Sequence, residues 1–236
     1  MQNTKLILFL KSFSAHEFKL FNDFVSSPIF NKNQNVVSLF KSLKKFYPEF
    51  QNKNSTSENI FTKLFPNEKY NYFKLKNIIS DLLSLGKEFL AVNYFLKNPD
   101  LKTKILLEQF RDRNLDNMFL QLYNESDKKL KNSYIHDEYY FLSKLELTEE
   151  LISFYSPKEP NTHINLFQNQ LNNFLYYSII RLLRIYNVMF HESKQNNFIY
   201  DMKMFEEVFH YIENNKKFDN PTILLYYNII LLEKNC

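Results

Sequence analysis

The chain has 236 residues but a single glycine, Gly86, where average composition would supply about sixteen. It also has no tryptophan and only one cysteine, Cys236, at its last position. Loops that wrap phosphates or dinucleotides need several glycines, because their backbone approaches the ligand closely or takes positive φ. β-Sandwiches and barrels need turn residues every ~8–12 positions, and disulfide scaffolds and Cys-based zinc sites need more cysteines. The composition therefore excludes these classes of protein.

Long apolar runs are missing as well. The longest, over residues 175–190, is interrupted by two arginines and an asparagine, whereas a membrane-spanning helix needs about 20 apolar residues. The N-terminal run Leu6–Leu10 is short and flanked by lysines, and no small-residue cleavage site follows it, so it does not match a signal peptide. We therefore expect a cytoplasmic protein with no membrane partner.

The chain is instead rich in aromatic residues, with 25 phenylalanines and 16 tyrosines that can fill a hydrophobic core. Apolar residues recur at spacings of three and four, the period of amphipathic helices. This spacing predicts helices over residues 15–27, 36–47, 57–65, 71–95, 100–111, 114–131, 134–155, 162–191, 200–214 and 220–234. We expect an all-α fold in which an N-terminal helical module precedes an antiparallel helical bundle or an α-solenoid-like array.

Polar residues at the predicted helix starts support this assignment. A Ser or Asn side chain can accept a hydrogen bond from a free N–H of the first turn, and a Glu three residues later can close a capping box. The expected capping boxes are Ser14 with Glu17 and Ser55 with Glu58, and the expected asparagine caps are Asn71, Asn161 and Asn220.

Gly86 lies inside the predicted helix 71–95. It could serve as a hinge, or it could let another helix pack closely at a cost of about 1 kcal/mol relative to alanine. Close packing is the interpretation that we favour.

The last predicted helix is apolar nearly all round between Ile223 and Leu232. Such a helix should be covered on more than one side. Three explanations stay open: the helix inserts into the core, a partner covers it, or the natural chain continues and this is a fragment.

Charge divides the chain near Pro99. Residues 1–97 carry fourteen lysines, no arginine and seven acidic residues, a net charge of +7, whereas residues 98–236 carry sixteen basic and nineteen acidic residues, a net charge of −3. We therefore expect two domains: a basic helical module at residues 1–98 and a mildly acidic helical hairpin array at residues 99–236, truncated at its C-terminus if the chain is a fragment.

Two groups of lysines in the basic module either form an ordinary solvated surface or are candidate contacts for nucleic acid or a protein partner. Helices 57–65 and 71 onward, with the turn between them, could form a helix-turn-helix, and a helix start together with lysines attracts phosphate. Against this, the module has no arginine, the turn has no glycine and the second helix is long. The candidate residues are Lys41, Lys44, Lys45, Lys69, Asn71, Lys74 and Lys76.

The sequence offers no catalytic residue, metal site or cofactor site. Glu207 and His210 form one Glu-x-x-His pair, but di-iron bundles need two such pairs and further carboxylates. The five histidines fall on separate elements, Cys236 is terminal, and no nucleophile, base and orienting group occur together. We expect a protein that is not an enzyme.

Four segments together resemble the N-terminal region of an uncharacterised all-helical protein family of the Bacteroidota. They are SPIFNKN at 27–33, LFKSLKKFYPEF at 39–50, LFPNEKYN at 64–71 and ISDLL at 79–83. The resemblance covers residues 14–97, and the longer members of the family continue into more helices. The resemblance implies a recurring basic module and either a fragment or a shortened chain, but no activity and no functional residue.

Two hypotheses about function follow. The first is a helical scaffold whose C-terminal helices bind a protein partner, and the second is a nucleic-acid-binding regulator that uses residues 1–98.

Overall fold

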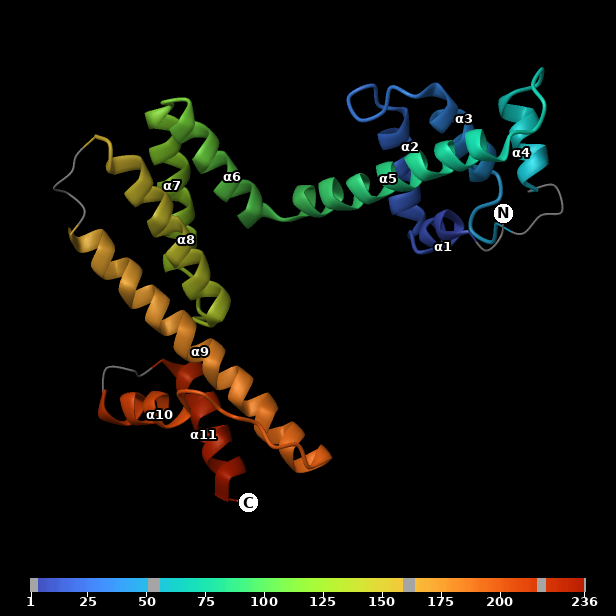
Figure 1. Ribbon diagram of the computed structural model, residues 1–236. Helices are drawn as coiled ribbons and strands as arrows, with labels where there is room; N and C mark the ends of the chain where they lie inside the picture. Colours follow the sequence, from blue (N-terminus) through green and yellow to red (C-terminus); the bar gives the residue numbers. More distant parts are fainter. Residues whose placement is uncertain (1–3, 51–55, 159–163, 216–219, 236) are drawn as a thin grey trace. The chain divides into compact units, whose positions relative to one another are not determined.

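The computed structural model describes residues 4–50, 56–158, 164–215 and 220–235. These residues form eleven α-helices and no strand, which confirms the all-α prediction. The chain divides into two compact units, residues 1–98 and 99–236, and the division falls at Pro99 (Figure 1). No helix in the described part of the chain is both long enough and apolar enough to cross a membrane.

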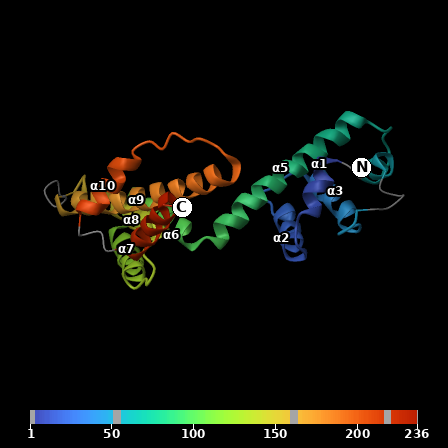
Figure 2. The same cartoon turned by 90° about the horizontal axis from the view of Figure 1, so that it is seen from below.

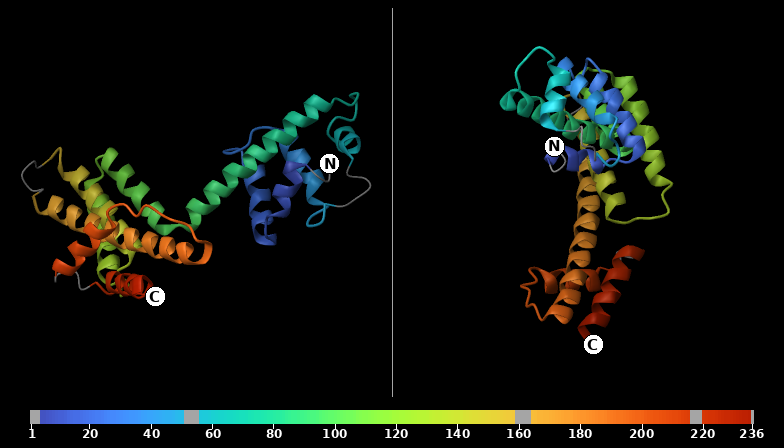
Figure 3. Two further views of the ribbon diagram at one scale, coloured as in Figure 1. Left: turned by 60° about the horizontal axis from the view of Figure 1, so that its bottom comes forward. Right: turned by 90° about the vertical axis from the view of Figure 1, so that its right-hand side faces the viewer.

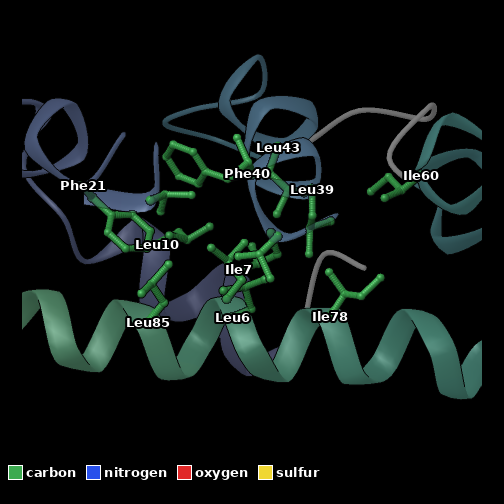
Figure 4. Packing of buried hydrophobic residues seen from close by; sticks show 14 of the residues in the cluster. Leu6, Ile7, Leu10, Phe21, Leu39, Phe40, Leu43, Ile60, Ile78 and Leu85 are labelled. Carbon is green, nitrogen blue, oxygen red and sulfur yellow. The ribbon is translucent and has the colours of Figure 1, made fainter. Parts of the chain in front are cut away.

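The N-terminal unit is built along one long helix. Its helices are α1 (Lys5–Lys11), α2 (Ala15–Ser26), α3 (Gln34–Lys44), α4 (Ser57–Leu64) and α5 (Tyr72–Lys97). The first three gather against α5 (Figure 2). Side chains from α1–α4 meet the apolar face of α5 from one side (Figure 4). A single hydrophobic core therefore joins all five helices.

Phenylalanines fill the centre of this core. The ring centroids of Phe13 and Phe21 lie 5.3 Å apart, and Phe21 lies 5.1 Å from Phe40 and 5.2 Å from Phe89. These are the spacings of favourable edge-to-face and tilted contacts between rings. The aromatic richness of the sequence is thus used for packing in this unit.

Gly86 is a point of close approach between α5 and a second helix, α1. A Cβ atom added at Gly86 would lie 2.4 Å from Cε1 of Phe9, which belongs to α1. Real Cβ atoms are not found at such distances, so the ring occupies the space that a side chain would need. The close-packing interpretation of Gly86 is confirmed, and α5 runs unbroken through this position.

The helix α1 was missing from the predicted set. Its seven residues complete fewer than two turns, too few for an apolar period to be recognised. In the structure Thr4 caps α1 by accepting a hydrogen bond from the N–H of Ile7, and Leu6, Ile7 and Leu10 are buried.

The C-terminal unit contains the other six helices. They are α6 (Pro99–Asp112), α7 (Asp116–Lys131), α8 (Glu138–Tyr155), α9 (Ile164–Asn196), α10 (Phe205–Asn214) and α11 (Pro221–Asn235). The first three pack on one another as a small bundle around stacked Phe119 and Phe154, whose centroids are 4.2 Å apart. The long helix α9 packs on both α8 and α11 (Figure 3). The helices α6, α7 and α8 thus form a bundle, and α9 connects this bundle to α11.

Three of the five predicted caps are present in the structure, and the predicted cap of α4 is wrong. The Ser14–Glu17 capping box is present, and Asn71 and Asn220 cap α5 and α11 through their side-chain oxygens. The helix α4 is capped by Thr56 and not by the predicted Ser55–Glu58 box: the Thr56 side chain accepts a hydrogen bond from the N–H of Asn59, so the N-cap lies one residue later than expected. Two predicted caps, Ser55 and Asn161, lie outside the described residues.

Where the structure describes the residues before a helix, three predicted starts were too early by two residues or more. The helix α7 begins at Asp116 rather than at residue 114. Asp137 accepts hydrogen bonds from the N–H groups of Tyr139 and Tyr140, so α8 begins at Glu138 rather than at residue 134. Met204 has a φ of 58°, which no helical residue adopts, and α10 therefore begins at Phe205 rather than at residue 200.

Asparagine takes the place of glycine where α6 ends. Asn114 has a φ of 55°, the left-handed conformation that usually selects glycine after a helix. The N–H of Leu115 donates to the carbonyl of Phe110 at 2.9 Å, and the N–H of Asn114 donates to that of Arg111 at 3.0 Å. This pair of bonds is a Schellman motif. Asn197, directly after α9, has a φ of 54°.

The first prediction concerns Gly86→Ala. Alanine favours a helix by about 1 kcal/mol, but its methyl group must displace the Phe9 ring, so we expect a net loss of about 1–3 kcal/mol in the free energy of unfolding. Urea denaturation followed by circular dichroism measures the loss, and hydrogen exchange of α5 assigns it to this unit. Adding Phe9→Leu should recover most of the loss. Ser84→Ala, at an exposed position of α5, is the control, and an equal effect there would contradict the close-packing explanation.

Candidate functional site

The first group of predicted lysines lies at the C-terminal end of α3. Lys41 and Lys44 are in its last turn, Lys45 is its C-cap, and all three side chains are exposed. Lys44 Nζ donates to Asn22 Oδ1 at 3.0 Å. Lysines at this end of a helix also interact favourably with its free carbonyl groups. Their position therefore has a structural explanation that does not require a ligand.

The second group surrounds the start of α5, and half of it is engaged within the chain. Asn71 Oδ1 accepts a hydrogen bond from the N–H of Lys74 at 3.0 Å, which occupies a group that a phosphate would use. Lys74 Nζ lies 2.7 Å from Glu68 Oε1 and 3.7 Å from the centre of the Phe65 ring. The remaining two lysines, Lys69 and Lys76, are exposed.

The connection between α4 and α5 differs from a helix-turn-helix. It spans residues 65–71, longer than the usual turn of about three or four residues. Phe61 contacts Phe65 and Tyr70 with ring centroids 5.0 and 5.4 Å apart, and α4 packs mainly on α3. The helix-turn-helix expected from α4 and α5 is therefore not formed, and the two lysine groups lie at the ends of two different helices, α3 and α5.

A site that the sequence did not predict lies inside the C-terminal unit. A cavity of about 310 Å³ opens between α6, α7 and α8. Its apolar lining is Leu107, Leu130 and Leu147. Its polar lining is Asp100, Thr103, Lys104, Ser126, Lys129, Ser133, Ser143, Glu146 and Glu150. No motif marks these residues, because they occupy ordinary positions of three amphipathic helices.

Two ion pairs lie on the rim of this cavity. Lys104 Nζ lies 2.7 Å from Glu146 Oε1, and Lys129 Nζ lies 3.2 Å from Asp100 Oδ1. The hydrogen bond from Lys104 to Glu146 raises the pKa of the lysine. Burial raises the pKa of Glu150, although Arg111 Nη1 is only 2.5 Å from its carboxylate. The rim therefore carries fixed charges of both signs around an apolar base.

Most hydroxyl groups of the cavity lining are engaged within the chain. No histidine or cysteine lines the cavity, and three of its four hydroxyls are engaged with backbone. Thr103 Oγ1 donates to the carbonyl of Pro99 at 3.0 Å. Ser126 Oγ donates to the carbonyl of Leu122 at 2.8 Å, and Ser133 Oγ donates to that of Ile135 at 3.0 Å. The arrangement suits the binding of an apolar group bordered by polar atoms.

The isolated Glu207–His210 pair gains no companions in the fold. The His210 ring nitrogens lie 3.1 Å from Asn214 Nδ2. Throughout the described ranges, no three His, Cys, Asp or Glu side chains gather closely enough to hold a metal ion.

The apolar helix at the C-terminal end of the chain is only half covered. In α11, Ile223 and Ile230 are fully buried against α9 and α10, whereas Leu224, Leu225 and Leu232 are exposed. One face thus inserts into the core, as the first of the three explanations expected, and the other face is open in this chain.

Comparison of the chain with protein-family models, characterised proteins and solved structures found no match. The resemblance of residues 14–97 to a helical family of the Bacteroidota stays a prediction.

The second prediction concerns Asp127, which joins α7 to α8 beside the cavity. Burial alone would raise its pKa, but hydrogen bonds from Lys131 and Lys144 outweigh burial and lower it. A lowered pKa means that the stabilisation is present above the unfolded pKa near 4 and is lost as the pH falls through the folded pKa. Asp127→Asn should therefore destabilise the unit at pH 7 by about 0.5–1 kcal/mol, since solvent partly screens the group.

Hydrogen exchange of α7 and α8 at pH 7 and near pH 3 measures this effect. The difference between wild type and Asp127→Asn should shrink at the lower pH. Glu125→Gln, at an exposed position of α7, is the control. A difference that stays constant with pH would contradict the assigned role of the Asp127 carboxylate.

Proposed function

We propose that the protein is a non-enzymatic, cytoplasmic helical scaffold whose C-terminal unit binds a protein partner at the cavity between α6, α7 and α8. The observation that carries this proposal is the combination of an apolar base with a charged rim. Protein interfaces have the same composition, an apolar centre surrounded by polar groups. Partners commonly anchor themselves by placing one large side chain in such a pocket.

The size and charge of the cavity favour a protein segment as its occupant. Its volume of about 310 Å³ is at the lower end of the range for small-molecule sites, about 300–1,000 Å³. The charged groups of the rim are already paired within the chain, Lys104 with Glu146 and Lys129 with Asp100, so an occupant would meet ion pairs that present both signs of charge. A segment with one apolar side chain between charged residues of both signs would meet all of these groups.

The third prediction concerns Ser143→Leu, which places an apolar side chain in the cavity. Ser143 lines the cavity and is only partly buried, so the larger side chain fills open space without disturbing the bundle core. We expect affinity for the partner to fall at least tenfold. Ser153→Leu is the matched control, since Ser153 is exposed on the same helix and outside the cavity.

Affinity enrichment with the three full-length proteins identifies any partner that only Ser143→Leu loses. Calorimetric titration of that purified partner into wild type and both variants then gives the dissociation constants. Equal binding by Ser143→Leu and wild type would contradict the proposal, as would a partner that binds only through the N-terminal unit.

A second candidate function, nucleic-acid binding by residues 1–98, is supported by one observation. Lys41, Lys45, Lys69 and Lys76 are exposed and make no ion pair or side-chain hydrogen bond with the residues described. Next to the second pair, Tyr72 and Phe73 are also exposed. Lysines beside exposed aromatic rings are typical of surfaces that bind single-stranded nucleic acid by stacking.

The fourth prediction tests this second candidate with a fluorescently labelled single-stranded oligonucleotide. If residues 1–98 bind it, affinity should fall steeply with salt, with a slope of about −0.7 per phosphate neutralised. Lys69→Glu with Lys76→Glu should then weaken binding at least tenfold at about 50 mM salt. Lys87→Glu with Lys97→Glu, farther along α5, keeps the same net charge and is the control. Equal loss in both double variants would indicate a non-specific charge effect and would reject the proposed surface.

A further inference from the structure

A line of apolar side chains is left uncovered along α9. Phe167, Leu171, Phe174, Ile185 and Val188 are each between 43% and 55% exposed, although α9 packs on α8 and α11 through its opposite face. The buried residues of that opposite face are Ile179, Ile180, Leu183 and Tyr186. The exposed line is therefore separate from the core and separate from the cavity between α6, α7 and α8.

The spacing of the exposed residues is that of a coiled-coil seam. From Phe167 to Val188 the steps are alternately four and three residues, with Ser178 and Arg181 at the two intervening positions. This alternation keeps seven positions on one face of a helix, the arrangement by which two helices interlock. We call these seven positions the α9 seam.

The apolar area of the seam is large for an uncovered surface. Five half-exposed side chains, at roughly 100 Å² each, amount to on the order of 500 Å², about the size of patches that mark interaction sites. A stable interface buries about 800 Å² per partner, so the two polar positions and flanking side chains would contribute the remainder.

The order of residues along the seam identifies its occupant. We propose that the α9 seam binds the same seam of a second copy of this chain, with the two helices antiparallel and a two-fold axis between Ser178 and Arg181. In this register Leu171 meets Val188 of the second copy, and Phe174 meets Ile185. The polar Ser178 and Arg181 then meet each other, so every apolar position from 171 to 188 faces an apolar one. A parallel pair would instead place the two Arg181 side chains opposite each other.

The charge at the centre of this pairing is already compensated within each copy. Arg181 Nη1 donates to Glu138 Oε1 at 3.1 Å, and the same carboxylate oxygen accepts a hydrogen bond from Arg184. Glu138 itself is buried. Arg181 is half exposed, so its other N–H groups are free to donate to Ser178 Oγ of the second copy. A polar layer of this kind fixes register and orientation in coiled coils.

The fifth prediction is that the full-length protein is a dimer in solution. Sedimentation velocity between about 1 and 100 μM should give twice the 28.7 kDa of one chain at the upper end. Phe174→Glu, at an exposed position, should keep the helical content and weaken the dimer at least tenfold. Asn169→Glu, exposed elsewhere on α9, is the matched control and should leave the dimer unchanged.

Cross-linking distinguishes the two orientations, in chains that also carry Cys236→Ser. An equimolar mixture of Leu171→Cys and Val188→Cys should form mixed disulfides on oxidation, while neither protein alone should form them. Cross-linking of each variant with itself would show a parallel pair and overturn the proposal. A monomer at every concentration would also overturn it, as would a seam occupied by a different protein. None of these outcomes bears on the cavity, which Ser143→Leu tests separately.

Discussion

The contact between Phe9 and Gly86 determines how the N-terminal unit is assembled. Because Gly86 has no side chain, the Phe9 ring lies against the backbone of α5 and brings α1 with it. The ring then packs on Phe13, with centroids 5.1 Å apart, and Phe13 packs on Phe89 of α5 at 5.5 Å. One missing Cβ atom thus positions the first of a connected set of aromatic rings, and the rest of the core is arranged around that set.

The C-terminal unit depends on a single helix with two different apolar faces. Through Ile180 and Leu183, α9 organises the core that contains α10 and α11, and its seam carries a second apolar line that the described chain leaves open. The carboxylate of Glu138 pairs with Arg181, one of the seam positions, and with Arg184, and so holds α9 against the start of α8. Folding and association would therefore use the same helix without competing for the same residues.

The sequence predicted those features that depend on local chemistry. Helix caps such as Ser14 and Asn220, and the close packing at Gly86, follow from what a short segment can bond or exclude. Features that depend on several helices were missed. Lys74 was counted as a free charge because its pairing with Glu68 and Phe65 depends on how residues 65–71 fold. The cavity needs three helices to exist, and the α9 seam is hidden in a sequence where apolar residues occur on both faces.

The scarcity of glycine has a consequence for the unfolded chain. Glycine has the largest conformational freedom of any residue, and replacing it where the native backbone allows stabilises a protein by about 0.4–1 kcal/mol, chiefly through the unfolded state. Asn114 and Asn197 perform the left-handed turns that glycine usually performs, with a side chain that restricts the backbone before folding. A chain with one glycine therefore loses less backbone entropy on folding than its length suggests. This chain begins folding from a stiffer ensemble.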